Sequence, residues 1–212
     1  MKLYKKTLKY SIVLLLVCVF LSFVFEFSCL SKLNLASFLL DYMIGVACSI
    51  IVVVVTTYLQ FKYEQEKTLK SILSNIQFFF FDYLLIVLSL DPDEETPDKL
   101  WEYYYDETYN GIKKISSELS NLEWFSKAKS KTSGELQVAV LSIMTDMVKA
   151  SGRRNREGLS QIIDNPMLRV VKNKAILLAD SHEYYKEEII KNYEQIQEEL
   201  DNLKTKKSNI KI

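Results

Sequence analysis

Two long apolar segments near the N-terminus constrain this chain more than any other feature. Tyr10–Leu30 and Leu35–Leu59 each contain a single charged residue. At 1.5 Å per residue, each is long enough as a helix to cross a hydrocarbon layer of roughly 30 Å. Because only four residues separate them, we expect a tight antiparallel pair. The sequence therefore predicts an N-terminal transmembrane hairpin within residues 1–60, with spans at about 10–30 and 35–59.

The lysines predict the orientation of this hairpin. Basic residues lie on both outer flanks (Lys2, Lys5, Lys6 and Lys9 before the first segment; Lys62, Lys67 and Lys70 after the second), whereas the turn has Lys32 alone. The positive-inside rule then places both termini in the cytoplasm, in a multi-pass protein of the inner (plasma) membrane. A cleaved signal peptide is the alternative for the first segment, but its apolar run is longer than a usual signal core and no A-x-A-like site follows.

Small and polar residues within the two segments recur at helical spacing. The first stripe is Ser11, Cys18, Ser22, Glu26 and Cys29, and the second is Ser37, Asp41, Gly45, Ser49 and Thr56. Close packing of lipid-embedded helices through small residues explains such stripes. The other interpretation is a water-filled path in a homo-oligomer, in which a ring of carboxylates favours cations. On that interpretation the membrane polar face consists of Ser22, Glu26, Asp41, Gly45 and Ser49.

The rest of the chain, residues 61–205, is predicted to be a cytoplasmic all-α bundle. Only 5 Gly and 3 Pro occur in 212 residues, which disfavours a turn-rich β fold. The apolar stretch Ser71–Leu90 is interpreted as the central helix of the bundle, continuous or nearly so with the second span. Its four consecutive phenylalanines, Phe78–Phe81, cover the whole circumference of a helix and so predict burial on every side. A third membrane span is the alternative.

Capping signals predict the remaining helix boundaries. Thr96 and Pro97 open a helix whose apolar positions include Ile112 and Ile115. Thr132 and Glu135 form a capping box that predicts a helix over 133–150, closed by Gly152, and Asn165-Pro166 opens another. Apolar positions at steps of three and four then predict one long C-terminal heptad helix from Leu168 to Leu203, with a frayed tail at 206–212.

Few residues offer catalytic or metal chemistry. The only histidine, His182, falls on the heptad seam, and all three cysteines lie in the apolar segments. No nucleotide-binding or nucleophile-elbow motif is present. We therefore predict no catalytic residue, metal or cofactor, and favour a protein that is not an enzyme.

One basic cluster stands out at residues 149–174. Within it Arg153, Arg154, Asn155 and Arg156 lie between two predicted helices, where guanidinium groups and a following helix N-terminus can converge on an anion. The functional interpretation is a site for phosphate, RNA, a nucleotide signal or a protein trigger. The alternative is a basic loop that pairs with the acidic 91–107 stretch.

The segment Arg154–Leu159 resembles the R-N-x-x-x-H motif of HEPN ribonucleases, small helical bundles found in bacterial antiviral systems. Leu159 occupies the position of the catalytic histidine. Together with the hairpin, this pattern is similar to the HEPN-like membrane accessory proteins of type VI-B CRISPR systems. The resemblance implies that oligomers assemble a pore and that Arg154 and Asn155 serve in binding or structure rather than catalysis.

Three hypotheses follow for function. The first is a membrane-embedded oligomeric effector that forms a pore or perturbs the membrane under the control of its cytoplasmic domain, in antiviral defence. The second is a non-conducting anchor for a helical module that docks a partner. The third is a membrane-bound HEPN ribonuclease.

Overall fold

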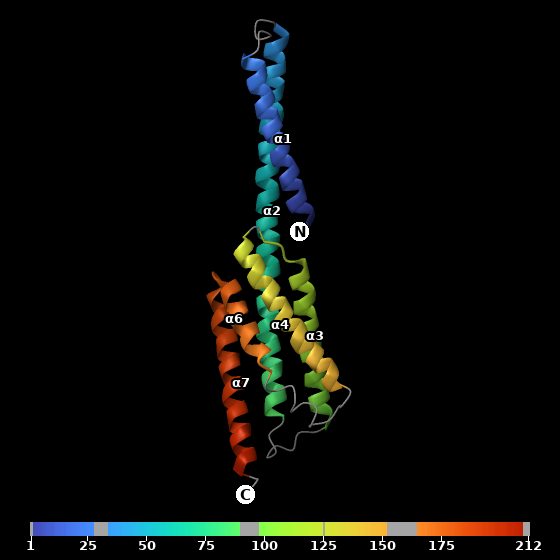
Figure 1. The fold of residues 1–212 in the computed structure, drawn as a ribbon, viewed down its shortest axis with the longest axis vertical. Helices are drawn as coiled ribbons and strands as arrows, with labels where there is room; N and C mark the ends of the chain where they lie inside the picture. Colours follow the sequence, from blue (N-terminus) through green and yellow to red (C-terminus); the bar gives the residue numbers. More distant parts are fainter. Residues whose placement is uncertain (1, 28–33, 90–97, 125, 152–164, 210–212) are drawn as a thin grey trace. The chain divides into compact units, whose positions relative to one another are not determined.

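The computed structural model describes residues 2–27, 34–89, 98–124, 126–151 and 165–209. Within these ranges the chain forms six helices and no strand (Figure 1), which confirms the all-α prediction. The helices are α1 (Lys2–Phe27), α2 (Asn34–Leu88), α3 (Asp98–Asn121), α4 (Lys127–Ser151), α6 (Met167–Ala179) and α7 (Glu183–Asn209).

The chain divides into two compact units, Met1–Lys67 and Thr68–Ile212, and the division falls inside α2. We call Asn34–Lys67 the first segment of α2 and Thr68–Leu88 its bundle segment. The predicted continuity of the second apolar segment with the Ser71–Leu90 stretch is confirmed, because α2 continues without interruption to Leu88.

The first unit consists of α1 and the first segment of α2. Leu8 and Cys18 of α1 and Ile50 and Thr57 of α2 are buried, while large apolar side chains over most of both helices are exposed. Both α1 and α2 contain stretches long and apolar enough to cross a membrane, at Lys6–Val24 and Asp41–Leu88. Contiguous exposed apolar surface of this kind marks contact with lipid or with other proteins.

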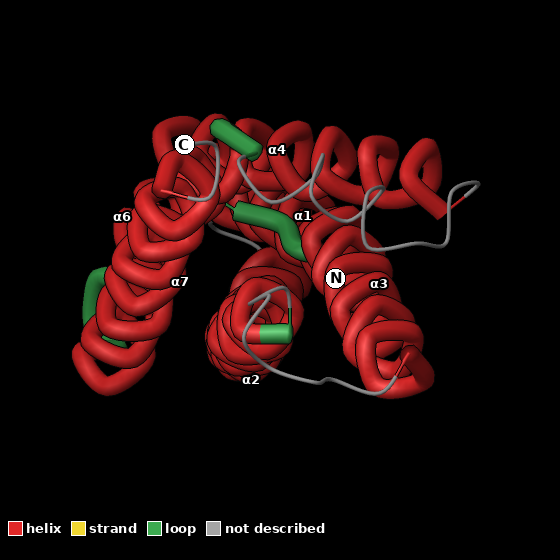
Figure 2. The backbone as a smooth tube through the Cα atoms, turned by 90° about the horizontal axis from the view of Figure 1, so that it is seen from below, coloured by secondary structure: helices red, strands yellow, loops and turns green. Residues whose placement is uncertain are grey.

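In the second unit the bundle segment of α2 is the central helix. Glu118 of α3 accepts hydrogen bonds from Ser71 Oγ and Asn75 Nδ2, both at 2.9 Å, which fixes α3 along one side. The ring of Tyr193 on α7 meets Phe80 edge-on at 5.9 Å on another side. Helix α4 contacts both α3 and α6. Together with α7, these three helices cover the central helix on three sides (Figure 2).

The inner face of the bundle segment forms the core of the second unit. Eight of its residues are at most 1% exposed: Ile72, Leu73, Ile76, Phe79, Phe80, Tyr83, Ile86 and Val87. The prediction that all four phenylalanines are buried is wrong, because Phe78 is 59% and Phe81 48% exposed. The reason is geometric: the other helices surround α2 on three sides, and these two rings lie on the fourth.

The prediction of one long C-terminal heptad helix is also wrong. The chain breaks at Asp180, whose φ of 20° is outside the helical region, and resumes as α7 at Glu183. Lys172 Nζ lies 4.5 Å from the centre of the Tyr193 ring. A continuous helix would separate these residues by roughly 31 Å, so α6 and α7 fold back on each other. The predicted apolar positions are nevertheless buried, because both helices turn their apolar faces into one core. These positions include Leu168, Val171, Ala175, Leu178, Ile189, Ile196 and Leu200.

The predicted capping box at Thr132 and Glu135 does not start a helix. Helix α4 begins earlier, at Lys127, and Thr132 Oγ1 donates to the carbonyl of Ala128 at 3.1 Å. Ser126 lies just before the helix, and its Oγ accepts from the Lys129 amide at 3.5 Å. A serine cap six residues upstream therefore replaces the predicted one.

Other predicted boundaries agree better with the structure. A helix does begin at the predicted Asn165-Pro166 signal, one residue later than expected: α6 starts at Met167 with Pro166 at the N-cap position, and Asn165 Oδ1 accepts a hydrogen bond from the Met167 amide at 2.9 Å. The buried positions of α3 include the predicted Ile112 and Ile115. Thr96, Pro97 and Gly152 lie outside the described residues. Helix α7 extends to Asn209, beyond the predicted start of the tail at 206.

Adjacent phenylalanines provide a test of this burial pattern. Phe80→Ala should reduce the free energy of unfolding of the second unit by about 3–5 kcal/mol, because it opens a cavity in the core. Phe81→Ala should reduce it by about 0.5 kcal/mol or less in a detergent that separates the chains. Both tryptophans, Trp101 and Trp124, belong to this unit, so their fluorescence during denaturant titration measures the difference. Equal losses for the two variants would contradict the described burial.

Candidate functional site

The polar stripe of α1 lies toward the contact with α2. Cys18 is buried, Ser11 and Ser22 are half-buried, and Ser22 Oγ donates to the Cys18 carbonyl at 2.9 Å. This arrangement is typical of small residues used for helix packing. Glu26 belongs to α1, but its side chain and all of Cys29 lie outside the described part of the chain.

The polar stripe of α2 lies on the exposed surface of its helix. Asp41, Gly45, Ser49 and Thr56 are all exposed, and a Cβ placed on Gly45 would meet no atom within 4 Å. Ser49 Oγ donates to the Gly45 carbonyl at 3.0 Å, and Thr56 Oγ1 to the Val52 carbonyl at 2.9 Å. The hydroxyl groups are thus satisfied within their own helix, and the carboxylate of Asp41 is the charged group of this stripe.

The two stripes meet along one groove in the first unit. The groove has a volume of about 660 Å³ and is lined by Ser11, Leu14, Tyr42, Gly45, Val46, Ser49, Ile50 and Val53. Gly45 and Ser49, two of the predicted face residues, line it together with Ser11 of α1, whereas Ser22 and Asp41 do not line it. An apolar chain or a helix from another molecule fits such a surface better than a polar solute does.

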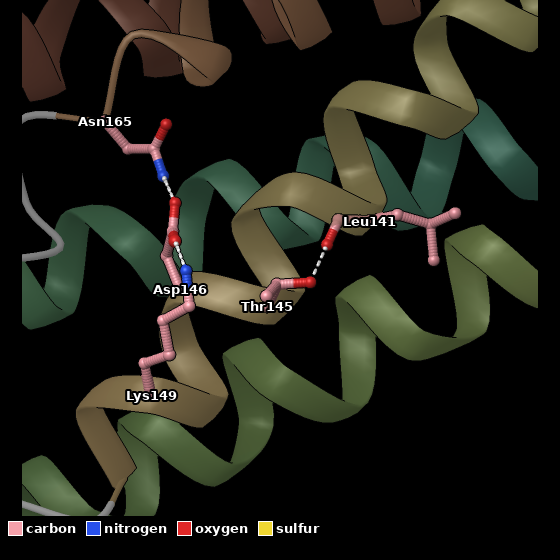
Figure 3. Close-up of polar contacts among 5 residues, drawn as sticks. All are labelled: Leu141, Thr145, Asp146, Lys149 and Asn165. Carbon is pink, nitrogen blue, oxygen red and sulfur yellow. Dashed lines mark hydrogen bonds and ion pairs between the residues drawn. The ribbon is translucent and has the colours of Figure 1, made fainter.

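The predicted anion-binding residues Arg153, Arg154, Asn155 and Arg156 lie outside the described residues, but the chain on both sides of them is described. Asp146 on α4 accepts from Lys149 Nζ at 3.3 Å and from Asn165 Nδ2 at 3.1 Å (Figure 3). One carboxylate therefore binds a residue before segment 152–164, Lys149, and a residue after it, Asn165. In Figure 3 the neighbouring Thr145 hydroxyl is directed into its own helix, to the Leu141 carbonyl at 2.8 Å.

Other lysines of the predicted basic cluster have partners within the bundle. Lys174 forms an ion pair with Glu135, and this hydrogen bond lowers the pKa of the Glu135 carboxyl group. Lys172 lies over the ring of Tyr193. Together with Lys149, these residues stabilise contacts of α4, α6 and α7. An anion site at this cluster therefore depends on its arginines, which are Arg153, Arg154, Arg156 and the exposed Arg169.

One ionisable residue of interest was not singled out by sequence reasoning. Asp82 is half-buried on the bundle segment of α2, and burial, assisted by the charge of Glu107 on α3, raises its pKa from 3.8 to about 6. A lone acid within an apolar run was the available signal. This carboxyl group therefore changes its charge between roughly pH 5 and 7.

The described residues contain no group of three or more His, Cys, Asp or Glu side chains that could hold a metal ion. His182 is half-buried at the turn between α6 and α7, with its ring 6.4 Å from that of Tyr185. Its carbonyl accepts from the Lys186 amide at 3.2 Å, so this residue helps to start α7.

The raised pKa of Asp82 predicts a pH-dependent stability. The folded protein binds this proton more tightly than the unfolded chain, so the free energy of unfolding should increase as pH falls from about 7 through 6 toward 4. Asp82→Asn should remove this increase, and Glu107→Gln should reduce it, because a repelling charge is lost. Tryptophan fluorescence at each pH measures the stability. An unchanged pH profile for Asp82→Asn would contradict the assignment.

The double role of Asp146 predicts a graded loss of stability. Asp146→Ala should cost about 1–3 kcal/mol, because it removes both the lysine pair and the hydrogen bond to Asn165. Asp146→Asn retains an acceptor for Asn165 and should cost less. Lys131→Ala, which removes an exposed ion pair on the same helix, serves as the control. Denaturant titration ranks the three variants, and equal costs for Ala and Asn would argue against the tie to Asn165.

Comparison of the chain with protein-family models, with curated proteins and with solved structures gives no match in any of the three.

Proposed function

We propose that this protein is a membrane-embedded oligomeric effector. Helices α1 and α2 cross the bilayer as a hairpin, with both chain termini in the cytoplasm. Several copies assemble around a common axis and form a pore or otherwise perturb the membrane. The helical unit that begins at Thr68 controls this assembly from the cytoplasm.

The observation that carries the proposal is the exposed apolar surface of the first unit. Large side chains such as Phe20 (67% exposed), Leu16 and Val52 point away from the contact between the two helices. Exposing apolar surface to water costs about 25 cal/mol per Å², whereas lipid covers it without that cost. The lysine-rich flanks of both segments match the interfacial and cytoplasmic positions that this arrangement requires.

The exposed stripe of α2 supports assembly between copies. Gly45 and Ser49 are four residues apart, and this spacing of small residues permits close approach of a second helix in lipid. Asp41 lies near the start of the same stripe. In a ring of copies, repeated Asp41 carboxylates, with those of Glu26, would favour cations at the outer end of the path.

The cytoplasmic unit acts on the same helix that bears this stripe. We assign the control to this unit because α2 contributes residues to both units. The trigger we favour is an RNA or nucleotide anion bound by Arg153, Arg154 and Arg156, in keeping with the resemblance to HEPN-like accessory proteins of antiviral systems.

A non-conducting anchor is the second candidate, and one observation favours it. The hydroxyl groups of Ser49 and Thr56 donate to carbonyls of their own helix. They therefore need no water path and can face lipid or another helix without loss of hydrogen bonds. In that case the hairpin holds the helical unit at the membrane, where the unit recruits a partner.

Particle mass and ion flux together test the proposal. The protein extracted in detergent should form a particle of several copies, and in liposomes with its trigger it should pass cations faster than anions. Asp41→Asn with Glu26→Gln should reduce this preference severalfold, because the ring loses its charge. Asp106→Asn, which neutralises an exposed acid of α3, is the matched control and should leave the preference unchanged. A single-chain particle would exclude the pore, and a stable oligomer without flux would favour the anchor.

A further inference from the structure

The bundle segment of α2 has one face that the described helices of its own unit leave uncovered. Phe78, Phe81 and Leu88 are exposed, and Ser74 and Leu85 are half-buried. These five residues follow at steps of four and three, so they lie along one side of the helix. We call this surface, with its two phenylalanines and two leucines in line, the open face. Apolar surface of this kind usually has a partner.

Helices α3 and α7 lie along the two edges of the open face. On one edge Ser71 and Asn75 donate to Glu118 of α3. On the other edge the Gln77 carbonyl accepts from Asn192 Nδ2 of α7 at 3.3 Å. Figure 2 shows α2 nearly end-on between α3 and the α6–α7 pair. The open face therefore has one helix on each side of it.

The edge along α3 is mainly acidic. Glu107 and Glu118 are about three turns apart and share one side of α3, and the charge of Glu107 acts on Asp82 of α2. The hydrogen bonds that Glu118 accepts come from neutral side chains, so they leave its negative charge in place. Lys114 lies on the same side of α3 between the two glutamates and is the base of this edge.

The edge along α7 is acidic as well. Glu188 and Glu199 lie four residues before and seven residues after Asn192. Residues at this spacing share one side of a helix, and in α7 this is the side that contacts the Gln77 carbonyl. Glu199 accepts only from the neutral amide of Asn202, at 3.5 Å, so the charge of this edge is also negative.

The negative charge around the open face is not balanced within its unit. Five carboxylates border the face, and none of them forms an ion pair with another residue in the described part of the chain. They belong to Asp82, Glu107, Glu118, Glu188 and Glu199. Against them stands Lys114, while Lys70, near one end of the face, has an interaction of its own. Such a surface attracts groups of positive charge.

Charge and apolar pattern together decide which occupant fits. A second copy of the open face would bring the same carboxylates together, and anionic lipid headgroups would also meet like charge, so both are opposed. A helix with apolar residues at steps of three and four and with basic residues on both flanks matches the apolar strip and the acidic edges at once. It would pack on the one side of α2 that the described helices leave open.

We propose that the open face docks a basic amphipathic helix of a partner protein. The apolar residues of the partner cover the rings of Phe78 and Phe81, and its basic flanks pair with carboxylates of α3 and α7. The inference goes beyond the membrane function and names the class of partner that the helical unit recruits. It rests on one element of the proposed function, the cytoplasmic position of this unit, because lipid would otherwise cover the open face.

Peptide binding to the full chain tests the inference. The probe is a fluorescent peptide of about 16 residues with leucines at helical spacing and arginines on both flanks. The chain is held in nanodiscs of phosphatidylcholine, with empty nanodiscs as background, and anisotropy at neutral pH should show saturable binding. Phe78→Ser with Phe81→Ser should weaken it by about tenfold or more, because the peptide loses its apolar contact.

The matched control is Val138→Ser with Leu177→Ser. These residues of α4 and α6 are 68% and 60% exposed, so the change removes similar apolar surface elsewhere in the same unit. Binding by the control should be unchanged, and tryptophan fluorescence should show that both double variants are folded. Equal binding by the two double variants would overturn the inference.

A second pair of variants tests the acidic edges. Glu188→Gln with Glu199→Gln should weaken peptide binding severalfold and reduce its dependence on salt. Glu187→Gln with Glu194→Gln removes the same charge from exposed positions about half a turn away from Asn192, on the other side of α7. This control should change binding by about twofold at most. Equal losses would mean that the peptide responds to net charge alone and would refute docking at the open face.

Maleimide labelling separates this inference from the proposed function. In a background of Cys18→Ser, Cys29→Ser and Cys48→Ser, Phe81→Cys should react with a charged maleimide, whereas Leu16→Cys on α1 should be protected by lipid. If Phe81→Cys reacts but no peptide binds, docking is wrong and the proposed function stands. If Phe81→Cys is protected by lipid, the cytoplasmic position and the docking are both wrong. A disulfide dimer through Phe81→Cys would assign the face to a second copy and overturn the inference.

Discussion

The structure depends on burial of one side of a single helix. Ile72, Ile76, Phe80 and Tyr83 turn toward the other helices of the second unit, and their enclosure is the main apolar contribution to its stability. The hydrogen bonds of Glu118 and the ring contact of Tyr193 then fix which helix lies on which side. The same helix also supplies part of the first unit, where its residues Ile50 and Thr57 are buried.

Sequence periodicity predicted the buried residues more accurately than it predicted where the chain turns between helices. The buried positions of α3 and of the C-terminal region follow the expected spacing. However, periodicity cannot distinguish one long helix from two helices that fold back and share a core, so the turn at Asp180 was missed. Local signals were similarly ambiguous. A helix follows Asn165-Pro166 as expected, whereas the helix predicted to start at Thr132 begins instead after Ser126, because both residues offer an equivalent oxygen.

The candidate site was predictable in its residues but not in its arrangement. The helical spacing identified both polar stripes, yet it could not show that Cys18 is buried while Asp41, Gly45 and Ser49 are exposed. That difference depends on the rotation of each helix about its axis, which packing decides. Composition likewise identified a basic cluster, but it did not show that Lys172 contacts the Tyr193 ring and that Lys174 pairs with Glu135 within the bundle. The free apolar face of Phe78 and Phe81 escaped prediction because hydrophobicity alone does not reveal which side remains open.

The tie at Asp146 has a consequence for how this protein can diversify. Its carboxylate accepts hydrogen bonds from Lys149 on the same helix and from Asn165, which lies just before α6, so it joins α4 to the start of α6. A change at Asp146 or Asn165 alone leaves the other residue without this hydrogen bond, so the effects of changing the two positions are coupled and the positions are expected to vary together.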